Sequence, residues 1–245
     1  MSGRFLLCLL CCFSASVFAD LPDTIARIKP SIVGVGFYDK AASPRGQLFG
    51  TGFVIAPQLV ATNAHVVNPS LLTGKRQFVV FIGTGRSPEV RTATVIKRDT
   101  RHDLAILKIA GSPLPALRLS TRLVREGERY SFTGFPIGAI LGLYPATHQG
   151  IVASITPIAT PANHARELTV QQLRQLKKPY DVYQFDATAY PGNSGSPVYH
   201  PETGEVIAII NKVFVKTSKE SMLTDPSAIT YAIPIQHLIT LKQSL

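Results

Sequence analysis

A serine flanked by glycines lies in the segment Asp186-Ala187-Thr188-Ala189-Tyr190-Pro191-Gly192-Asn193-Ser194-Gly195-Ser196-Pro197. A serine hydroxyl is a weak nucleophile unless a neighbouring base takes its proton and backbone N–H groups bind the oxyanion that forms. Glycine at 192 and 195 permits a tight turn, in which the amides of Gly192 and Ser194 can converge on one point. The segment therefore suits nucleophilic catalysis, although an ordinary Gly-rich turn with a surface serine has the same composition.

A histidine and an aspartate lie next to apolar strand-like segments elsewhere in the chain, His65 after Leu59 to Ala61 and Asp103 before Leu104 to Ile109. Histidine serves as base and then acid near neutral pH when one ring nitrogen is held by a partner, and Asp103 could be that partner. Each residue alone has a simpler explanation, a structural histidine and a turn-forming aspartate. Together, the chain order His65, Asp103, Ser194 matches one known order of the Ser-His-Asp triad.

With these residues the sequence resembles the trypsin-like serine proteases, and among them the HtrA/DegP-like proteases of the bacterial envelope. The resemblance covers nearly all of the chain after residue 19. It rests on Thr-Asn-Ala-His at 62–65, Asp-Leu-Ala-Ile-Leu-Lys at 103–108, Asp-Ala at 186–187, Pro-Gly-Asn-Ser-Gly at 191–195 and Tyr-Ala-Ile-Pro at 231–234. It implies an all-β, chymotrypsin-like fold of two six-stranded antiparallel β-barrels with short peripheral helices.

The resemblance also implies the reaction, hydrolysis of peptide bonds in proteins through an acyl-enzyme without metal or cofactor. Ser194 would attack the carbonyl, His65 would transfer the proton and Asp103 would orient His65. The amides of Gly192, Asn193 and Ser194 would form the oxyanion hole. Ser196 departs from the family pattern, which usually has a second glycine here, so the fold requires Ser196 to keep an ordinary φ.

The pocket for the side chain before the scissile bond is expected, by the same resemblance, at Thr188, Ala189, Tyr190, Ile210, Asn211, Ala228 and Thr230. Thr188 occupies the position that resembles the pocket base; because it is not an acid, we expect no strong preference for Arg or Lys. Ala228-Ile229-Thr230 replaces the Gly-Ile-Gly of many relatives. The added bulk favours small or medium aliphatic substrate residues such as Ala, Val or Leu.

Apolar segments of strand length recur between residues 32 and 155 and between 182 and 233, separated by Gly, Pro, Asn and Ser. About a dozen strands with little room for helices favours antiparallel barrels or a sandwich over a βαβ fold. Short helices are predicted over 24–28, capped by Asp23 and ended by Pro30, over 166–178, and over 236–244. We expect the two barrels to occupy about 20–120 and 121–245.

The first 19 residues combine Arg4, the apolar run Phe5 to Phe13 and a small-residue end before Asp20. This pattern predicts a secretory signal cleaved after Ala19, with a buried helix or an uncleaved anchor as the alternative. Removing these 19 of the 245 residues leaves 226, lowers the net charge from +10 to +9 by the loss of Arg4 and removes all three cysteines. We therefore expect a secreted or periplasmic protein with no transmembrane anchor in the mature form and no thiol chemistry.

Composition and motifs weigh against three other classes. With 45% apolar and 16% charged residues the chain is not disordered. Its scattered Lys and Arg form no aromatic-interleaved stripe, so we expect no nucleic-acid partner. An esterase nucleophile elbow fails because Ser196 replaces the second glycine of Gly-x-Ser-x-Gly. A catalytically weak chaperone or binding protein of the same fold stays an alternative, although the complete triad favours an enzyme.

The expected partners are protein or peptide substrates, unfolded proteins among them, and the oligomeric state stays open. Only 12 residues follow Ile233, so we expect no PDZ module of the kind that envelope relatives commonly carry. The polar excursion over 156–178 is either a regulatory or assembly element or a plain surface insertion.

Overall fold

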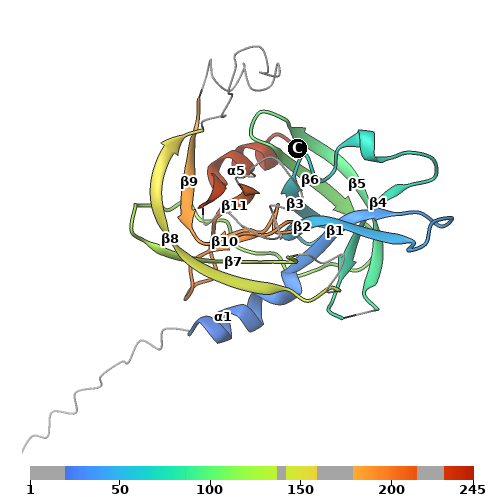
Figure 1. Ribbon diagram of the computed structural model, residues 1–245, viewed down its shortest axis with the longest axis horizontal. Helices are drawn as coiled ribbons and strands as arrows, with labels where there is room; N and C mark the ends of the chain where they lie inside the picture. Colours follow the sequence, from blue (N-terminus) through green and yellow to red (C-terminus); the bar gives the residue numbers. More distant parts are fainter. Residues whose placement is uncertain (1–19, 86, 137–141, 159–178, 214–228) are drawn as a thin grey trace, which may run out of the picture.

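Two closed six-stranded antiparallel barrels make up the computed structural model, which describes residues 20–85, 87–136, 142–158, 179–213 and 229–245 (Figure 1). The first barrel has the strand order β1-β2-β3-β6-β5-β4 and the second β10-β11-β12-β9-β8-β7. The predicted all-β double-barrel fold is therefore confirmed. The strands are β1 (Ile32–Tyr38), β2 (Gly46–Ala56), β3 (Leu59–Asn63), β4 (Gln77–Ile82), β5 (Glu89–Asp99), β6 (Leu104–Ile109), β7 (Arg129–Gly134), β8 (Ala146–Pro157), β9 (Asp181–Asp186), β10 (Pro197–Tyr199), β11 (Val206–Val213) and β12 (Ile229–Pro234).

Several strands are apolar on both faces because each face meets a different core. In β6, Ala105, Leu107 and Ile109 pack in a cluster of residues from the first barrel alone. The alternate residues Leu104 and Ile106 pack instead in a cluster that includes residues of the second barrel. Since successive side chains of a strand point to opposite faces, this arrangement explains the continuous apolar runs in the sequence. The cluster that contains residues of both barrels forms an apolar interface between them.

The N-terminal helix α1 (Leu21–Ile28) begins three residues earlier than predicted. Its N-cap is Asp20, whose carboxylate accepts a hydrogen bond from the Leu21 amide at 2.7 Å, whereas the predicted cap Asp23 lies inside the first turn. A 3₁₀ turn, η1 (Lys29–Ser31), then leads into β1. A second 3₁₀ turn, η2 (Pro69–Leu71), follows β3. The predicted helix over 166–178 lies outside the described residues, as does the predicted signal over 1–19.

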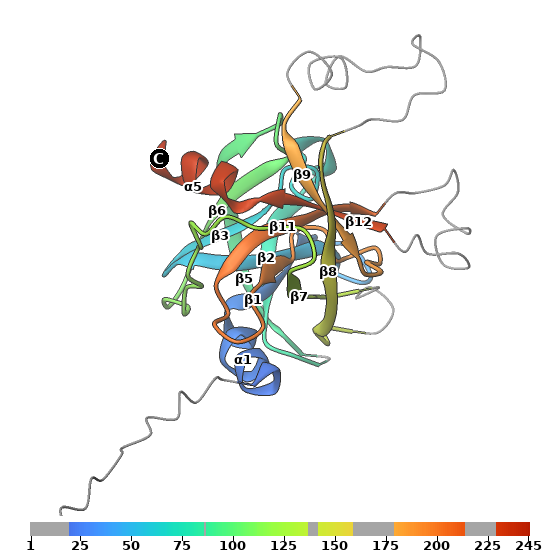
Figure 2. The ribbon, with the colours of Figure 1, turned by 90° about the vertical axis from the view of Figure 1, so that its left-hand side faces the viewer.

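The C-terminal helix α5 (Ile235–Gln243) confirms the helix predicted over 236–244 to within a residue. It follows β12 of the second barrel but lies against the first barrel (Figure 2). Lys242 Nζ donates to the Ile55 carbonyl at 2.9 Å, and Lys97 Nζ of β5 donates to the Ser244 carbonyl at 2.8 Å. Leu238 and Leu241 add to the shared core. Helix α5 therefore links the second barrel, from which it continues, to the first barrel.

None of the helices in the described ranges is both long and apolar enough to cross a bilayer.

Candidate active site

His65 and Asp103 meet because they lie just beyond the same end of two paired strands. Asn63, the last residue of β3, pairs with Leu104, the first residue of β6. The Asp103 carbonyl accepts hydrogen bonds from the Ala64 amide at 3.0 Å and from the Asn63 side-chain amide at 3.1 Å. Asp103 has a φ of +53°, which among the described residues no other non-glycine residue approaches. These bonds hold the aspartate in a left-handed conformation that a non-glycine residue adopts rarely.

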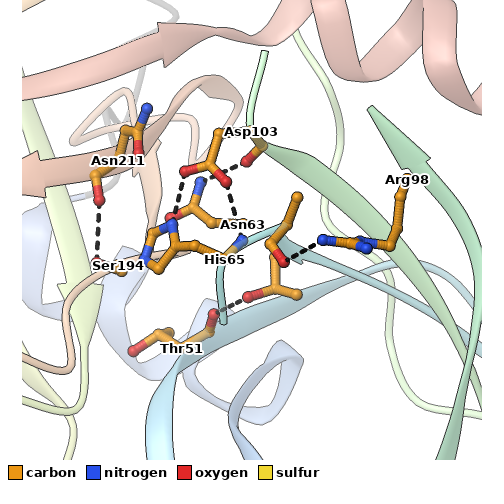
Figure 3. A network of polar contacts seen from close by, with 9 residues as sticks. Thr51, Asn63, His65, Arg98, Asp103, Ser194 and Asn211 are labelled. Atoms are coloured by element: carbon orange, nitrogen blue, oxygen red, sulfur yellow. Dashed lines mark hydrogen bonds and ion pairs between the residues drawn. The ribbon is translucent and has the colours of Figure 1, made fainter. Parts of the chain in front are cut away.

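Both carboxylate oxygens of Asp103 bind His65 (Figure 3). Oδ2 lies 2.6 Å from the ring Nδ1, and Oδ1 accepts from the His65 backbone amide at 2.9 Å. The Asp103 side chain is 12% exposed and that of His65 41% exposed, so the pair has a buried acid and an accessible imidazole. A proton on Nδ1 leaves the lone pair on Nε2, the nitrogen that a general base needs.

Ser194 lies on the other side of the His65 ring from Asp103 (Figure 3). Its hydroxyl donates to the carbonyl of Asn211, in β11, at 2.9 Å. A serine hydroxyl has one proton to donate, so this bond competes with donation to His65. General-base activation of Ser194 therefore requires the hydroxyl to redirect its proton from Asn211 to Nε2 of His65.

The loop before Ser194 presents two backbone amides without partners. A turn from Tyr190 to Asn193 closes with the Asn193 amide donating to the Tyr190 carbonyl at 3.0 Å, and Gly192 within it has a φ of +100°. The Asn193 amide, expected in the oxyanion hole, is thus engaged inside the turn. The amides of Gly192 and Ser194 have no hydrogen-bond acceptor among the described residues. These two amides are the ones able to receive an oxyanion.

The surroundings of Gly195 and Gly134 explain why these two positions near Ser194 are occupied by glycine. Gly195 has a φ of +88°, and a Cβ there would lie 2.0 Å from the Thr51 carbonyl of the first barrel. Ser196, by contrast, has no positive φ, as the sequence required. A Cβ on Gly134 would lie 2.0 Å from the Ser196 hydroxyl oxygen. The serine in place of the family's second glycine is therefore accommodated by the absence of a side chain at Gly134.

The Thr230 hydroxyl is hydrogen-bonded to the segment that carries other predicted pocket residues. Its buried hydroxyl donates to the Ala187 carbonyl at 2.5 Å and accepts from the Ala189 amide at 3.1 Å. Thr230 therefore anchors the segment that carries the predicted pocket residues Thr188 to Tyr190. Ile210, Asn211 and Ala189 are buried, Thr188 and Tyr190 are half-buried, and Ala228 lies outside the described residues.

Three ring side chains, those of His102, Tyr180 and His237, pack against one another beside Asp103 at the β5–β6 turn. His102 Nδ1 lies 2.5 Å from a carboxylate oxygen of Asp99, and its ring stacks on His237 of α5 with centroids 4.0 Å apart. Tyr180 packs edge-on against both rings. Burial, followed by the nearby His102, lowers the pKa of His237 to about 4, so its ring is neutral at neutral pH. Burial first, and then the charges of Asp103 and Asp99, raise the pKa of Tyr180.

Sequence reasoning missed three residues that hold this site. Asn63 lies in the motif at 62–65, which assigns no role to its side chain, and Thr51 lies outside the motifs that carry the resemblance. Arg98 donates to the Ala64 carbonyl at 3.2 Å, next to His65, and had no local signal at all. Thr51 of β2 donates its hydroxyl proton to the Gly192 carbonyl at 2.7 Å. A threonine between two glycines, Gly50 and Gly52, was the available hint for Thr51, because neighbours without side chains let another backbone approach.

The fold and the site together define a chymotrypsin-like double barrel with a Ser, a His and an Asp gathered where the two barrels meet. In the described ranges no group of three or more His, Cys, Asp or Glu side chains is placed to hold a metal ion.

Residues 50–209 match the family described as "Trypsin-like peptidase domain", so the chain belongs to the trypsin-like peptidase family. A "Probable periplasmic serine endoprotease DegP-like" of Halomonas elongata is 30% identical over 192 residues, 76% of this chain and 32% of that protein. The serine protease Rv3671c of Mycobacterium tuberculosis is 30% identical over 188 residues, 76% of this chain and 41% of that protein. The chain thus spans between a third and two fifths of the length of these relatives.

Solved structures have the same fold. The active form of the Rv3671c protease superposes with a TM-score of 0.64 at 23% identity, covering 89% of this chain and 82% of the other. The HtrA-type protease AlgW, solved with a decapeptide, gives a TM-score of 0.66 at 22% identity, covering 92% and 67%.

Proposed function

We propose that this protein is a serine endopeptidase that hydrolyses peptide bonds in proteins. The observation that carries the proposal is the His65–Asp103 pair, in which both carboxylate oxygens bind one histidine, placed beside a serine whose loop presents two unpartnered amides. A structural histidine needs neither the serine nor the amides. The membership of a family of trypsin-like peptidases supports the same reading.

In the proposed mechanism Ser194 Oγ attacks the peptide carbonyl as His65 Nε2 takes its proton. The amides of Gly192 and Ser194 bind the oxygen that becomes negative, and Asp103 stabilises the imidazolium. The tetrahedral intermediate then expels the amine, which receives the proton from His65, and leaves an acyl-enzyme on Ser194. A water molecule, deprotonated by His65, releases the acid and restores the serine. None of these steps requires a metal or cofactor.

The proposed substrates are peptide segments with a small or medium aliphatic residue before the scissile bond. The half-buried Thr188 offers no charge for a basic side chain, and Thr230 fixes the neighbouring backbone with both of its hydroxyl bonds. Sequencing of the peptides released from casein should show cuts mainly after Ala, Val or Leu. A profile dominated by Arg, Lys or large aromatic residues would overturn this preference.

The proposed site of action is outside the cytoplasm, in the periplasm or beyond. The signal predicted over residues 1–19 supports export, and so do relatives named as periplasmic proteases. The absence of cysteine after residue 12 means that the exported protein relies on its apolar cores and not on disulfides.

Reaction with a biotinylated fluorophosphonate, followed by mass spectrometry of the labelled peptide, tests the proposed function. We expect one label on Ser194, slow or no labelling of His65→Ala, and unchanged labelling of Ser154→Ala, which removes a half-buried serine of β8. Ser194 must be activated to react, so a label on Ser194 reports the assembled site. Absence of label in the folded protein, with casein still bound, would favour the chaperone or binding-protein alternative.

A further inference from the structure

Thr51, in the first barrel, binds two carbonyls of the segment 190–194 of the second barrel, which we call the oxyanion loop. Its backbone amide donates to the Ser194 carbonyl at 2.8 Å, and its hydroxyl donates to the Gly192 carbonyl at 2.7 Å. The residue is fully buried. Among the described residues, no other side chain donates a hydrogen bond to a carbonyl of this loop.

These two carbonyls bracket the amide of Ser194. The Gly192 carbonyl belongs to the peptide unit before Asn193, and the Ser194 carbonyl belongs to the unit before Gly195. The unit that carries the Ser194 amide lies between them. Gly192, with a φ of +100°, has no side chain to oppose rotation of its peptide units. A hydrogen bond from a buried hydroxyl supplies the restraint that the glycine lacks.

The direction of the Thr51 hydroxyl is itself fixed. The oxygen accepts a hydrogen bond from the Phe135 amide at 3.0 Å, so one lone pair is used and the proton is available for Gly192. The Thr51 carbonyl in turn accepts from the buried Thr62 hydroxyl at 2.7 Å. The threonine thus stands in a satisfied network that joins β2, β3 and the segment after β7 to the oxyanion loop.

We propose that Thr51 is a positioning residue that holds the Gly192 and Ser194 amides in the orientation that binds the oxyanion. The proposal rests on the proposed peptidase function for its catalytic consequence. Because Thr51 touches the loop and not the substrate, its loss acts on the transition state and leaves substrate binding nearly unchanged.

Thr51→Val tests the proposal because it keeps the shape and removes the hydroxyl. Removing one oxyanion donor outright costs about 10²–10³-fold in kcat, so a donor that is only misplaced should cost roughly 10–100-fold. We expect this loss in kcat, the same factor in affinity for a peptide boronate that mimics the tetrahedral intermediate, and a change in KM below about threefold. Thr51→Ser, which keeps the hydroxyl, should restore most of the activity.

Thr24→Val is the matched control, since Thr24 is equally buried and donates its hydroxyl to a backbone carbonyl, that of Glu202 in the β10–β11 connection. It should lower thermal stability without the loss of kcat. Should Thr51→Val fail to fold, Thr51→Cys compared with Thr51→Ser gives the same contrast, because a thiol is the weaker donor. Equal kcat and boronate affinity in both members of either pair, or a loss confined to KM, would overturn the proposal.

Amide hydrogen exchange separates this proposal from the proposed function. The amides of Asn193 and Gly195 are hydrogen-bonded, to the carbonyls of Tyr190 and Ile210, and their exchange should be faster in Thr51→Val than in the wild type and in Thr51→Ser, whether or not the protein hydrolyses peptides. A wild type that is neither labelled by fluorophosphonate nor active on casein defeats the proposed function alone. Unchanged exchange in a folded Thr51→Val protein defeats the role of Thr51.

Discussion

Replacing Ser194 with alanine should lower the rate of casein hydrolysis by roughly 10⁴-fold or more, the scale of loss when a catalytic triad is broken. Alanine offers no oxygen for the acyl-enzyme. The reaction that remains is direct attack by water on a peptide carbonyl bound in the oxyanion hole. The rate is measured by release of peptides from casein that has been labelled with a fluorophore.

The fold should survive this change, because the half-buried Ser194 hydroxyl makes one hydrogen bond, to the Asn211 carbonyl. Its removal costs about 1 kcal/mol of stability at most, by the usual net value of such a bond. Ser154→Ala, at another half-buried serine, in β8, serves as the activity control. Casein cleavage persisting at more than a hundredth of the wild-type rate in Ser194→Ala, free of contaminating protease, would contradict a Ser194 nucleophile.

Asp103→Asn should lower kcat/KM by a factor on the order of 10⁴, because the substitution changes the tautomer of His65. Asparagine has a single acceptor oxygen, whereas Asp103 uses two, one for the His65 amide and one for Nδ1. If the oxygen stays on the backbone amide, the NH₂ group faces Nδ1 and makes it an acceptor. The proton then lies on Nε2, and the base is lost.

The chain offers a matched control for this prediction in Asp99→Asn. Asp99 also accepts from the backbone amide and binds Nδ1 of a histidine, His102, but the ring of that histidine stacks on His237 of α5. This variant should lose stability while keeping most of its activity in hydrolysis of the same peptide substrate. Comparable losses in both variants would mean that Asp103 acts only by holding the β5–β6 turn, and would exclude the proposed orienting role.

The fold could be predicted because short segments of the sequence indicate the strands and close approaches that build it. Strands that are apolar on both faces, as in β6, and glycines at close approaches leave their mark on a few consecutive residues. The same holds for the three site motifs, which lie next to strand ends. Helix α1 shows the limit of this reasoning, since Asp20 and Asp23 are both residues that cap helices well, and the proline in the first turn, Pro22, fits a cap at Asp20.

The directions of hydrogen bonds in the site could not be predicted in the same way. The Asn193 amide turns to Tyr190, and the Thr230 hydroxyl turns to the backbone at Ala187. The partner of Thr51 is 141 residues away in the chain and belongs to the other barrel. Such choices are decided by groups that come together only after folding, so residue type and spacing do not encode them in any short segment.

The placement of α5 also bears on the order in which the protein is made. Domains generally fold as units during synthesis from the N-terminus, so the first barrel can form while the second is still on the ribosome. The hydrogen bonds of Lys242 and Ser244 with the first barrel belong to residues that are made after all the described strands. The contacts through which α5 links the two barrels therefore form only after the strands of both barrels have been made.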